Sequence, residues 1–214
     1  MVSIDNAKLI LLVFLKEPSK PQYIRQIANN CELSYERVQH YLKELEKQKV
    51  LTAKIKGKIK EYTLNRKHEL VLKIFSILEM ENRQIFYSKN LQFQAWLVNL
   101  VNELSKNLEK NTADIRFILL FGSTVRGDAK GGSDVDILLV ARNIDPTLQA
   151  TINQLKTRLE TLSGKFFSFH LVDYNEFIVK WKKEPIYATI WLDHITLYGE
   201  ESFWKEVLER GEPI

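Results

Sequence analysis

The chain has 214 residues, a length that suits two small domains better than one ordinary domain. No segment approaches the roughly 20 consecutive apolar residues of a membrane span, and Cys31 is the single cysteine, so we expect a globular cytoplasmic protein without a membrane segment or an internal disulfide framework. The net charge of +4 is unevenly distributed: residues 1–67 hold 14 Lys and Arg against 7 Asp and Glu, and the remainder holds 17 against 20, so the basic first third is the part suited to phosphate backbones.

Three helices followed by a hairpin are predicted in this basic region. The helices cover residues 6–16, residues 21–30 and a segment that begins after Ser34, a good N-cap residue. The stretch VLTAKIKGKIKEYTL (50–64) then alternates lysines with other residues. A period of two predicts a pair of strands with Gly57 at the tip and a row of lysines on the exposed side.

This order of elements resembles the winged helix-turn-helix family over about the first 65 residues. The resemblance implies that the helix after Ser34 is a recognition helix in the major groove and that the hairpin is a wing on the phosphates. The residues implied to contact DNA are Tyr35, Arg37, Gln39, His40, Lys54, Lys56, Lys58 and Lys60. A solvated face with edge-protecting lysines, or a winged domain that contacts protein, remains the alternative.

Residues 68–110 predict one or two connecting helices. The segment is nearly free of Gly and Pro and repeats apolar residues such as Trp96, Leu100 and Leu104 at helical spacing. The apolar stripe could pack within the chain or on a second copy in a homodimer.

A Gly-Ser pair and an Asp-x-Asp pair lie between two apolar runs in FGSTVRGDAKGGSDVDILLV (121–140). Residues 115–121 predict a buried strand, a helical turn and a polar loop follow, and residues 134–141 predict a second strand. Alternation along that strand places Asp134 and Asp136 on one side. Two carboxylates so placed suit Mg²⁺ or Mn²⁺, and these ions bind phosphates.

The glycine and hydroxyl residues of the same stretch suit a polyphosphate. Gly122 leaves room for phosphates near the backbone, and free N–H groups at the next turn attract anions. The candidate nucleotide-binding residues are Gly122, Ser123, Arg126 and Ser133. An ordinary turn between a loop and a strand would also explain Ser133 and Asp134, but an acid at Asp136 inside an apolar strand is costly unless it is paired or metal-bound.

This stretch resembles the signature of the DNA polymerase beta-like nucleotidyltransferase superfamily, most closely its minimal nucleotidyltransferase branch. The later ITLYGEESFW (195–204) resembles the ending common in that branch. The resemblance implies an α+β chain with a winged helix-turn-helix in 1–67, connecting helices in 68–110 and a mixed sheet with helices on one side in 111–214. It also implies that Gly122 and Ser123 hold an NTP, with ATP expected, and that Asp134 and Asp136 are the catalytic, metal-binding pair.

The third carboxylate that active members of this superfamily present is not found. The expected strand, KFFSFHLVDY (165–174), places Ser168 and His170 on its polar face, and His170 stands where the third acid would be. His170 could still be a metal ligand, although histidine suits transition metals better than Mg²⁺. Asp173 has the opposite parity and is expected to cap the following helix.

Three functions remain open from the sequence. The first is transfer of NMP from an NTP to an unknown acceptor, protein or RNA, by a chain that also binds DNA. The second is a catalytically impaired DNA-binding regulator that uses the transferase-like domain as a nucleotide sensor or a dimerisation element. The third, implied by the resemblance, is the antitoxin of a toxin-antitoxin pair.

Overall fold

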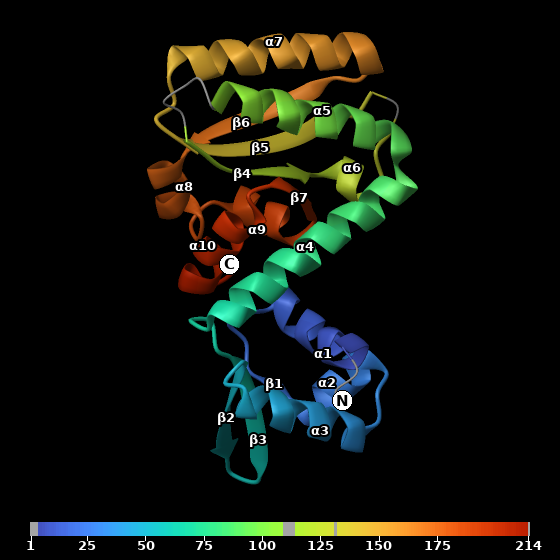
Figure 1. Cartoon of the computed structure of the whole chain (residues 1–214), viewed down its shortest axis with the longest axis vertical. Helices are drawn as coiled ribbons and strands as arrows, with labels where there is room; N and C mark the ends of the chain where they lie inside the picture. The colour runs from blue at the N-terminus through green and yellow to red at the C-terminus, as the bar shows by residue number, and fades with distance from the viewer. Residues whose placement is uncertain (1–3, 109–113, 131, 214) are drawn as a thin grey trace. The chain divides into compact units, whose positions relative to one another are not determined.

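The structure is a computed structural model that describes residues 4–108, 114–130 and 132–213 (Figure 1). The chain divides into two compact units, one of residues up to Phe75 with Lys205–Glu212 and one of Ser76–Trp204. Helices α4 (Glu69–Lys89) and α10 (Glu200–Arg210) contribute to both. The predicted limit at residues 110 and 111 lies outside the described residues, and the predicted domain limits stay predictions. No described helix has the length and apolar character needed to cross a membrane.

Besides parts of α4 and α10, the first unit combines three helices with a three-stranded antiparallel sheet of order β1-β3-β2. Its core is formed by apolar side chains that recur at helical spacing, such as Ile10, Phe14, Ile27, Val38 and Leu42, all of which are inaccessible to solvent. The elements are α1 (Ile4–Lys16), β1 (Gln22–Tyr23), α2 (Ile24–Cys31), α3 (Tyr35–Lys47), β2 (Leu51–Lys56) and β3 (Ile59–Leu64).

Local signals in this unit are confirmed. The Ser34 Oγ accepts a hydrogen bond from the Arg37 N–H at the start of α3. Gly57 adopts φ +65° in the turn between β2 and β3, a conformation that favours glycine.

Two expectations for this unit are wrong in detail. Gln22 and Tyr23 form a short strand ahead of α2 instead of its first turn, because they pair with β3. Lys60 pairs across the hairpin with Ile55, whereas Lys54 pairs with Glu61. Because side chains alternate along a strand, Lys60 lies on the face opposite Lys54 and Lys56, so the lysines do not form a single row.

The second unit is built on a four-stranded mixed sheet of order β6-β5-β4-β7, in which β5 and β6 are parallel and the other pairs are antiparallel. The α+β class and the mixed sheet are therefore confirmed. Besides parts of α4 and α10, its elements are α5 (Leu91–Leu108), β4 (Asp114–Phe121), α6 (Ser123–Arg126), β5 (Val135–Arg142), α7 (Pro146–Ser163), β6 (Phe167–Asp173), α8 (Tyr174–Lys180), α9 (Pro185–Leu192) and β7 (His194–Tyr198).

Helices cover both faces of this sheet, which corrects the expectation of helices on one side. Helices α5 and α7 lie on one face (Figure 1). Their leucines pack with Ile118, Ile137 and other inward residues of the strands. On the other face, the Phe117 ring lies 5.0 Å from the Phe177 ring of α8 and 5.4 Å from the Phe203 ring of α10. The central strands β4 and β5 are apolar on both sides because both sides are buried.

Candidate functional site

A sharp corner at Gly122 links the end of β4 to the short helix α6. Gly122 has φ +80° and ψ −154°, a conformation that only glycine adopts readily. A Cβ atom at this position would lie 2.6 Å from Asp136 Oδ2. The motif glycine is therefore required both by the backbone angle and by the carboxylate packed against it.

Asp136 lies in β5 directly beside Phe121, so its carboxylate adjoins the corner. Its side chain is only 29% exposed. Burial raises the pKa of Asp136, and repulsion from Asp134 raises it further, whereas His170 and Arg126 act in the opposite direction. The charged groups predicted for the site are thus close enough to affect one another.

The remaining motif residues occupy the loop around this carboxylate. Asp134 is exposed and immediately precedes β5, which begins at Val135. The exposed Arg126 directs its Nε to Asp128 Oδ2 at 3.2 Å, a partner that the sequence pattern did not indicate. The Ser133 Oγ accepts the Lys130 N–H at 3.0 Å, so this hydroxyl closes the loop.

The β6 side of the site carries His170 and Ser168. The His170 Nε2 lies 4.0 Å from Asp136 Oδ1 and 3.3 Å from the Ser168 Oγ. The ring of Phe121 lies 5.5 Å from the His170 ring. Ser168 and Phe121 were not predicted as site residues; alternation had placed Ser168 on the polar face of β6, which was the available signal.

Asp173 caps α8, as expected. One carboxylate oxygen accepts the Asn175 N–H at 2.8 Å and the Glu176 N–H at 3.4 Å. It therefore serves the helix instead of supplying a third carboxylate beside Asp136.

The carboxylates at this site suit a metal ion that binds together with a nucleotide better than a metal ion held by protein side chains alone. Among the described residues, no group of three or more His, Cys, Asp or Glu side chains converges on a common point. Mg²⁺ is commonly held by one or two carboxylates together with substrate phosphates. Asp136 and Asp134 supply two carboxylates of this kind.

The residues predicted to bind DNA lie in the first unit. On α3, Tyr35, Arg37 and His40 are exposed, and Gln39 is half-buried. Two hairpin lysines have carboxylate partners: Lys60 Nζ lies 2.7 Å from Glu46 Oε2, and Lys56 Nζ lies 3.6 Å from Glu61 Oε1. Lys54 and Lys58 are exposed near the same tip.

Comparison with known proteins gives the family. Residues 102–190 match the family model described as "Polymerase beta, Nucleotidyltransferase". A protein of Methanocaldococcus jannaschii named "Putative protein adenylyltransferase MJ1305" is 30% identical over 125 residues, which cover 55% of this chain and 82% of the relative. The chain belongs to the polymerase beta nucleotidyltransferase family. The matched range, 102–190, contains Gly122, both aspartates and His170.

Solved structures with limited likeness to this chain include a toxin-antitoxin with AMP-PNP, at 20% identity and a TM-score of 0.33, covering 50% of this chain and 82% of that one. A mutant of the toxin-antitoxin MntA-HpeT has 18% identity, the same TM-score of 0.33 and the same coverage of 50% and 82%. TrmBL2, an archaeal chromatin protein, has 16% identity and a TM-score of 0.25, covering 84% of this chain and 68% of that one.

Proposed function

We propose that this nucleotidyltransferase transfers AMP from ATP to a hydroxyl group of a protein acceptor. The family supports transfer of a nucleotidyl group, and the name of the M. jannaschii relative suggests both adenylate and a protein acceptor. The observation that carries the proposal is the packing of the Asp136 carboxylate against the Gly122 corner, with Asp134 and Arg126 close enough to shift its pKa.

Each residue of the site would have a separate role in the proposed reaction. An acceptor oxygen bonds to the α-phosphorus, the bond from that phosphorus to its bridging oxygen breaks, and pyrophosphate leaves. The backbone at Gly122 and Ser123 would bind the triphosphate, and Arg126 would offset its charge. Asp134 and Asp136 would hold Mg²⁺ or Mn²⁺, which when bound neutralises phosphate charge. The acceptor proton would pass to the solvent-accessible imidazole of His170.

The test is incubation of the full chain with Mg²⁺, a cell extract and ATP labelled at the α-phosphate. We expect label on protein, removed by protease and not by ribonuclease, and none from ATP labelled at the γ-phosphate. Asp136→Asn should abolish transfer. Asp114→Asn is the matched control, because Asp114 lies at the other end of the same sheet and is 46% exposed.

Two results would separate the alternatives. Label that ribonuclease removes would make RNA the acceptor. No label on any macromolecule, together with Mg²⁺–ATP binding that depends on Asp136, would favour the catalytically impaired nucleotide sensor. Absence of transfer would be explained by the histidine in place of a third acid. In that case, His170→Asp would be expected to restore transfer.

A second proposed activity is DNA binding by the first unit, as a winged helix-turn-helix. What supports it is the exposure of Tyr35, Arg37 and His40 along α3, beside a lysine-bearing hairpin, in the part of the chain with the excess of positive charge. The α3 residues would contact base edges, and the exposed lysines of the hairpin would contact phosphates.

Two lysines of the hairpin allow a matched test of this activity. Lys58 lies in the turn, whereas the ammonium of Lys60 is bonded to Glu46 and lies 5.1 Å from the centroid of the Tyr62 ring. In a titration of duplex DNA at several salt concentrations, Lys58→Ala should lower the slope of log K against log salt by about 1. Lys60→Ala should leave that slope nearly unchanged. Binding that does not vary with salt would contradict the proposal.

A further inference from the structure

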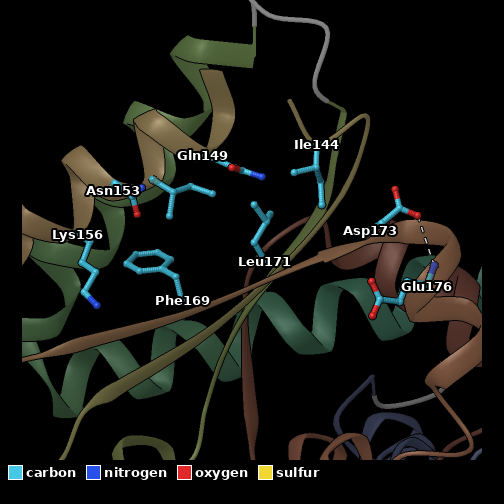
Figure 2. Close-up of a pocket in the computed structure, with 9 residues that line it drawn as sticks. Ile144, Gln149, Asn153, Lys156, Phe169, Leu171, Asp173 and Glu176 are labelled. Atoms are coloured by element: carbon cyan, nitrogen blue, oxygen red, sulfur yellow. Dashed lines mark hydrogen bonds between the residues drawn. The ribbon is translucent and has the colours of Figure 1, made fainter. Parts of the chain in front are cut away.

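A groove of about 510 Å³ lies between helix α7 and strand β6 of the second unit (Figure 2). Its apolar lining includes Ile152, Phe169 and Leu171. The amide side chains of Gln149 and Asn153, one helical turn apart on exposed positions of α7, lie along the same groove. The groove therefore offers an apolar surface beside polar groups that can both donate and accept hydrogen bonds.

The strand that borders this groove has an open edge. In the described part of the chain, β6 is the outermost strand and pairs with β5 alone. The Val135 N–H donates to the Phe166 carbonyl at 2.8 Å. This hydrogen bond determines which residues of β6 direct their backbone groups at β5. In a parallel pair, Ser168 and His170 then direct their backbone groups at β5, and Phe169 and Leu171 direct theirs outward.

The backbone N–H groups of β6 that point away from β5 need another hydrogen-bond acceptor, as Phe167 illustrates. Its N–H also points away from β5, and it donates to Glu160 Oε1 of α7 at 3.0 Å. In the described residues, no such acceptor reaches the outward N–H groups of Phe169 and Leu171. Natural edge strands are usually protected by lysine, proline or a covering segment, and the sequence of β6, FSFHLVD, contains neither lysine nor proline.

Acidic and basic side chains lie at different places along the groove. Asp173 and Glu176 lie at its α8 end, and Lys156 lies farther along α7 (Figure 2). Asp173 uses one oxygen, Oδ1, to cap α8, and Glu176 is paired with Lys180 at 2.6 Å. An occupant with a cationic side chain at the α8 end would therefore match the carboxylate of Asp173.

The groove is also separate from the candidate transfer site. Phe169 and Leu171 pack on the α7 side of the sheet, in contact with the apolar core. Ser168 and His170 alternate with them and face the side that carries Asp136. Occupation of the groove would therefore leave the Gly122 corner accessible.

We propose that this groove binds an extended peptide segment of a partner protein, which adds a strand to the open edge of β6. The outward N–H and C=O groups of Phe169 and Leu171 would pair with the peptide backbone. Alternate apolar side chains of the peptide would fill the surface formed by Ile152, Phe169 and Leu171. A lysine or arginine of the peptide would lie near Asp173. Peptide binding at this groove does not depend on nucleotidyl transfer.

The test begins with a phage-displayed library of random ten-residue peptides selected against the full chain. We expect enriched peptides that alternate apolar and polar residues and carry one basic residue. In amide hydrogen exchange followed by NMR, the synthesised peptide should slow exchange at Phe169 and Leu171. Exchange at Ser168 and His170, whose N–H groups already bond to β5, should change little. The Asp136→Asn chain should bind the peptide equally well.

Matched variants on α7 complete the test. Asn153→Arg places a long cation in the groove and should weaken peptide binding at least tenfold. Gln154→Arg, at the next exposed position and outside the groove lining, should change binding less than about twofold. The proposal is overturned if no peptide is enriched, or if enriched peptides bind without protecting Phe169 and Leu171. It is also overturned if sedimentation shows a dimer that Asn153→Arg dissociates, because a second copy then fills the groove.

Discussion

At the scale of single residues, the site depends on how closely a backbone and a carboxylate approach each other. Gly122 and Gly127 both have positive φ, at +80° and +77°. Only Gly122 has a side chain against it, with Asp136 Oδ2 2.6 Å from the position that a Cβ atom would take; nothing lies within 4 Å of the corresponding position at Gly127. Substitution at Gly127 would therefore cause backbone strain alone, whereas substitution at Gly122 would cause backbone strain and also displace Asp136.

Alanine at these two positions should give different results. Gly127→Ala should lower the free energy of unfolding by about 1 kcal/mol, the usual cost of a left-handed non-glycine residue, and leave nucleotide binding nearly intact. Gly122→Ala should lower stability by at least as much and also weaken Mg²⁺–ATP binding, because the methyl group displaces Asp136. Chemical unfolding and calorimetry of nucleotide binding measure the two effects. Equal nucleotide affinity in the two variants would contradict the proposed role of the Gly122 corner in nucleotide binding.

Asp136 should make stability depend on pH. Its pKa is raised in the folded protein, chiefly by burial, so the folded state binds the proton more tightly than the unfolded state does. The native protein therefore loses stability as pH rises from about 3.9, the ordinary pKa of aspartate, through the raised value. Asparagine does not ionise, so Asp136→Asn should be more stable than the native protein at pH 7 while binding less Mg²⁺–ATP.

Thermal unfolding measured from pH 7 downward checks this expectation. The advantage of Asp136→Asn should shrink as the pH falls towards the ordinary aspartate range. An advantage that is constant across this pH range would show that ionisation of Asp136 is not its source.

At the scale of elements, short-range signals determine where helices begin. Ser34 and Asp173 each precede a helix, and each accepts hydrogen bonds from the first free N–H groups of that helix. Both caps were predictable, because a cap depends on a few consecutive residues. The two-residue strand β1 was not, because its pairing with β3 joins Tyr23 to Glu61, far along the chain.

Substitution of Asp173 distinguishes a capping role from a catalytic one. Asp173→Ala should lower the free energy of unfolding by about 1 kcal/mol, because the Asn175 and Glu176 N–H groups lose their acceptor. Asp173→Asn should retain most of the stability, since asparagine is also a good cap. Both variants should transfer AMP at nearly the native rate. Loss of transfer in Asp173→Asn with native stability would instead assign Asp173 to the chemistry.

At the scale of the whole molecule, the nucleotidyltransferase unit is a sheet buried between two layers of helices. Phe117 projects from β4 into the layer formed by α8, α9 and the start of α10, where it contacts Phe177 and Phe203. Its side chain is inaccessible to solvent, whereas Val179 of α8 is 58% exposed. This second layer was not expected from the resemblance, and it doubles the number of sheet faces that contribute to the core.

Removal of the Phe117 ring should therefore be costly. Phe117→Ala should lower the free energy of unfolding by about 3–5 kcal/mol, the usual range for deleting a buried phenylalanine. Val179→Ala, an exposed control, should change it by less than about 0.5 kcal/mol. Denaturant titration of the full chain checks both values. Similar small losses in the two variants would mean that the second layer contributes little to stability.

Features that depend on neighbouring residues could be read from the sequence: the helix caps, the hairpin turn at Gly57, and a motif whose glycine and two aspartates indicated the transferase fold. Which residues meet across long separations depends on the folded chain. It placed Asp136 against Gly122, turned Lys60 towards Glu46 and brought the Thr196 hydroxyl to within 3.0 Å of Glu79 Oε2, 117 positions away. Periodicity gives the face of a strand or helix, but the partner of that face depends on how the packed elements exclude water and satisfy buried polar groups.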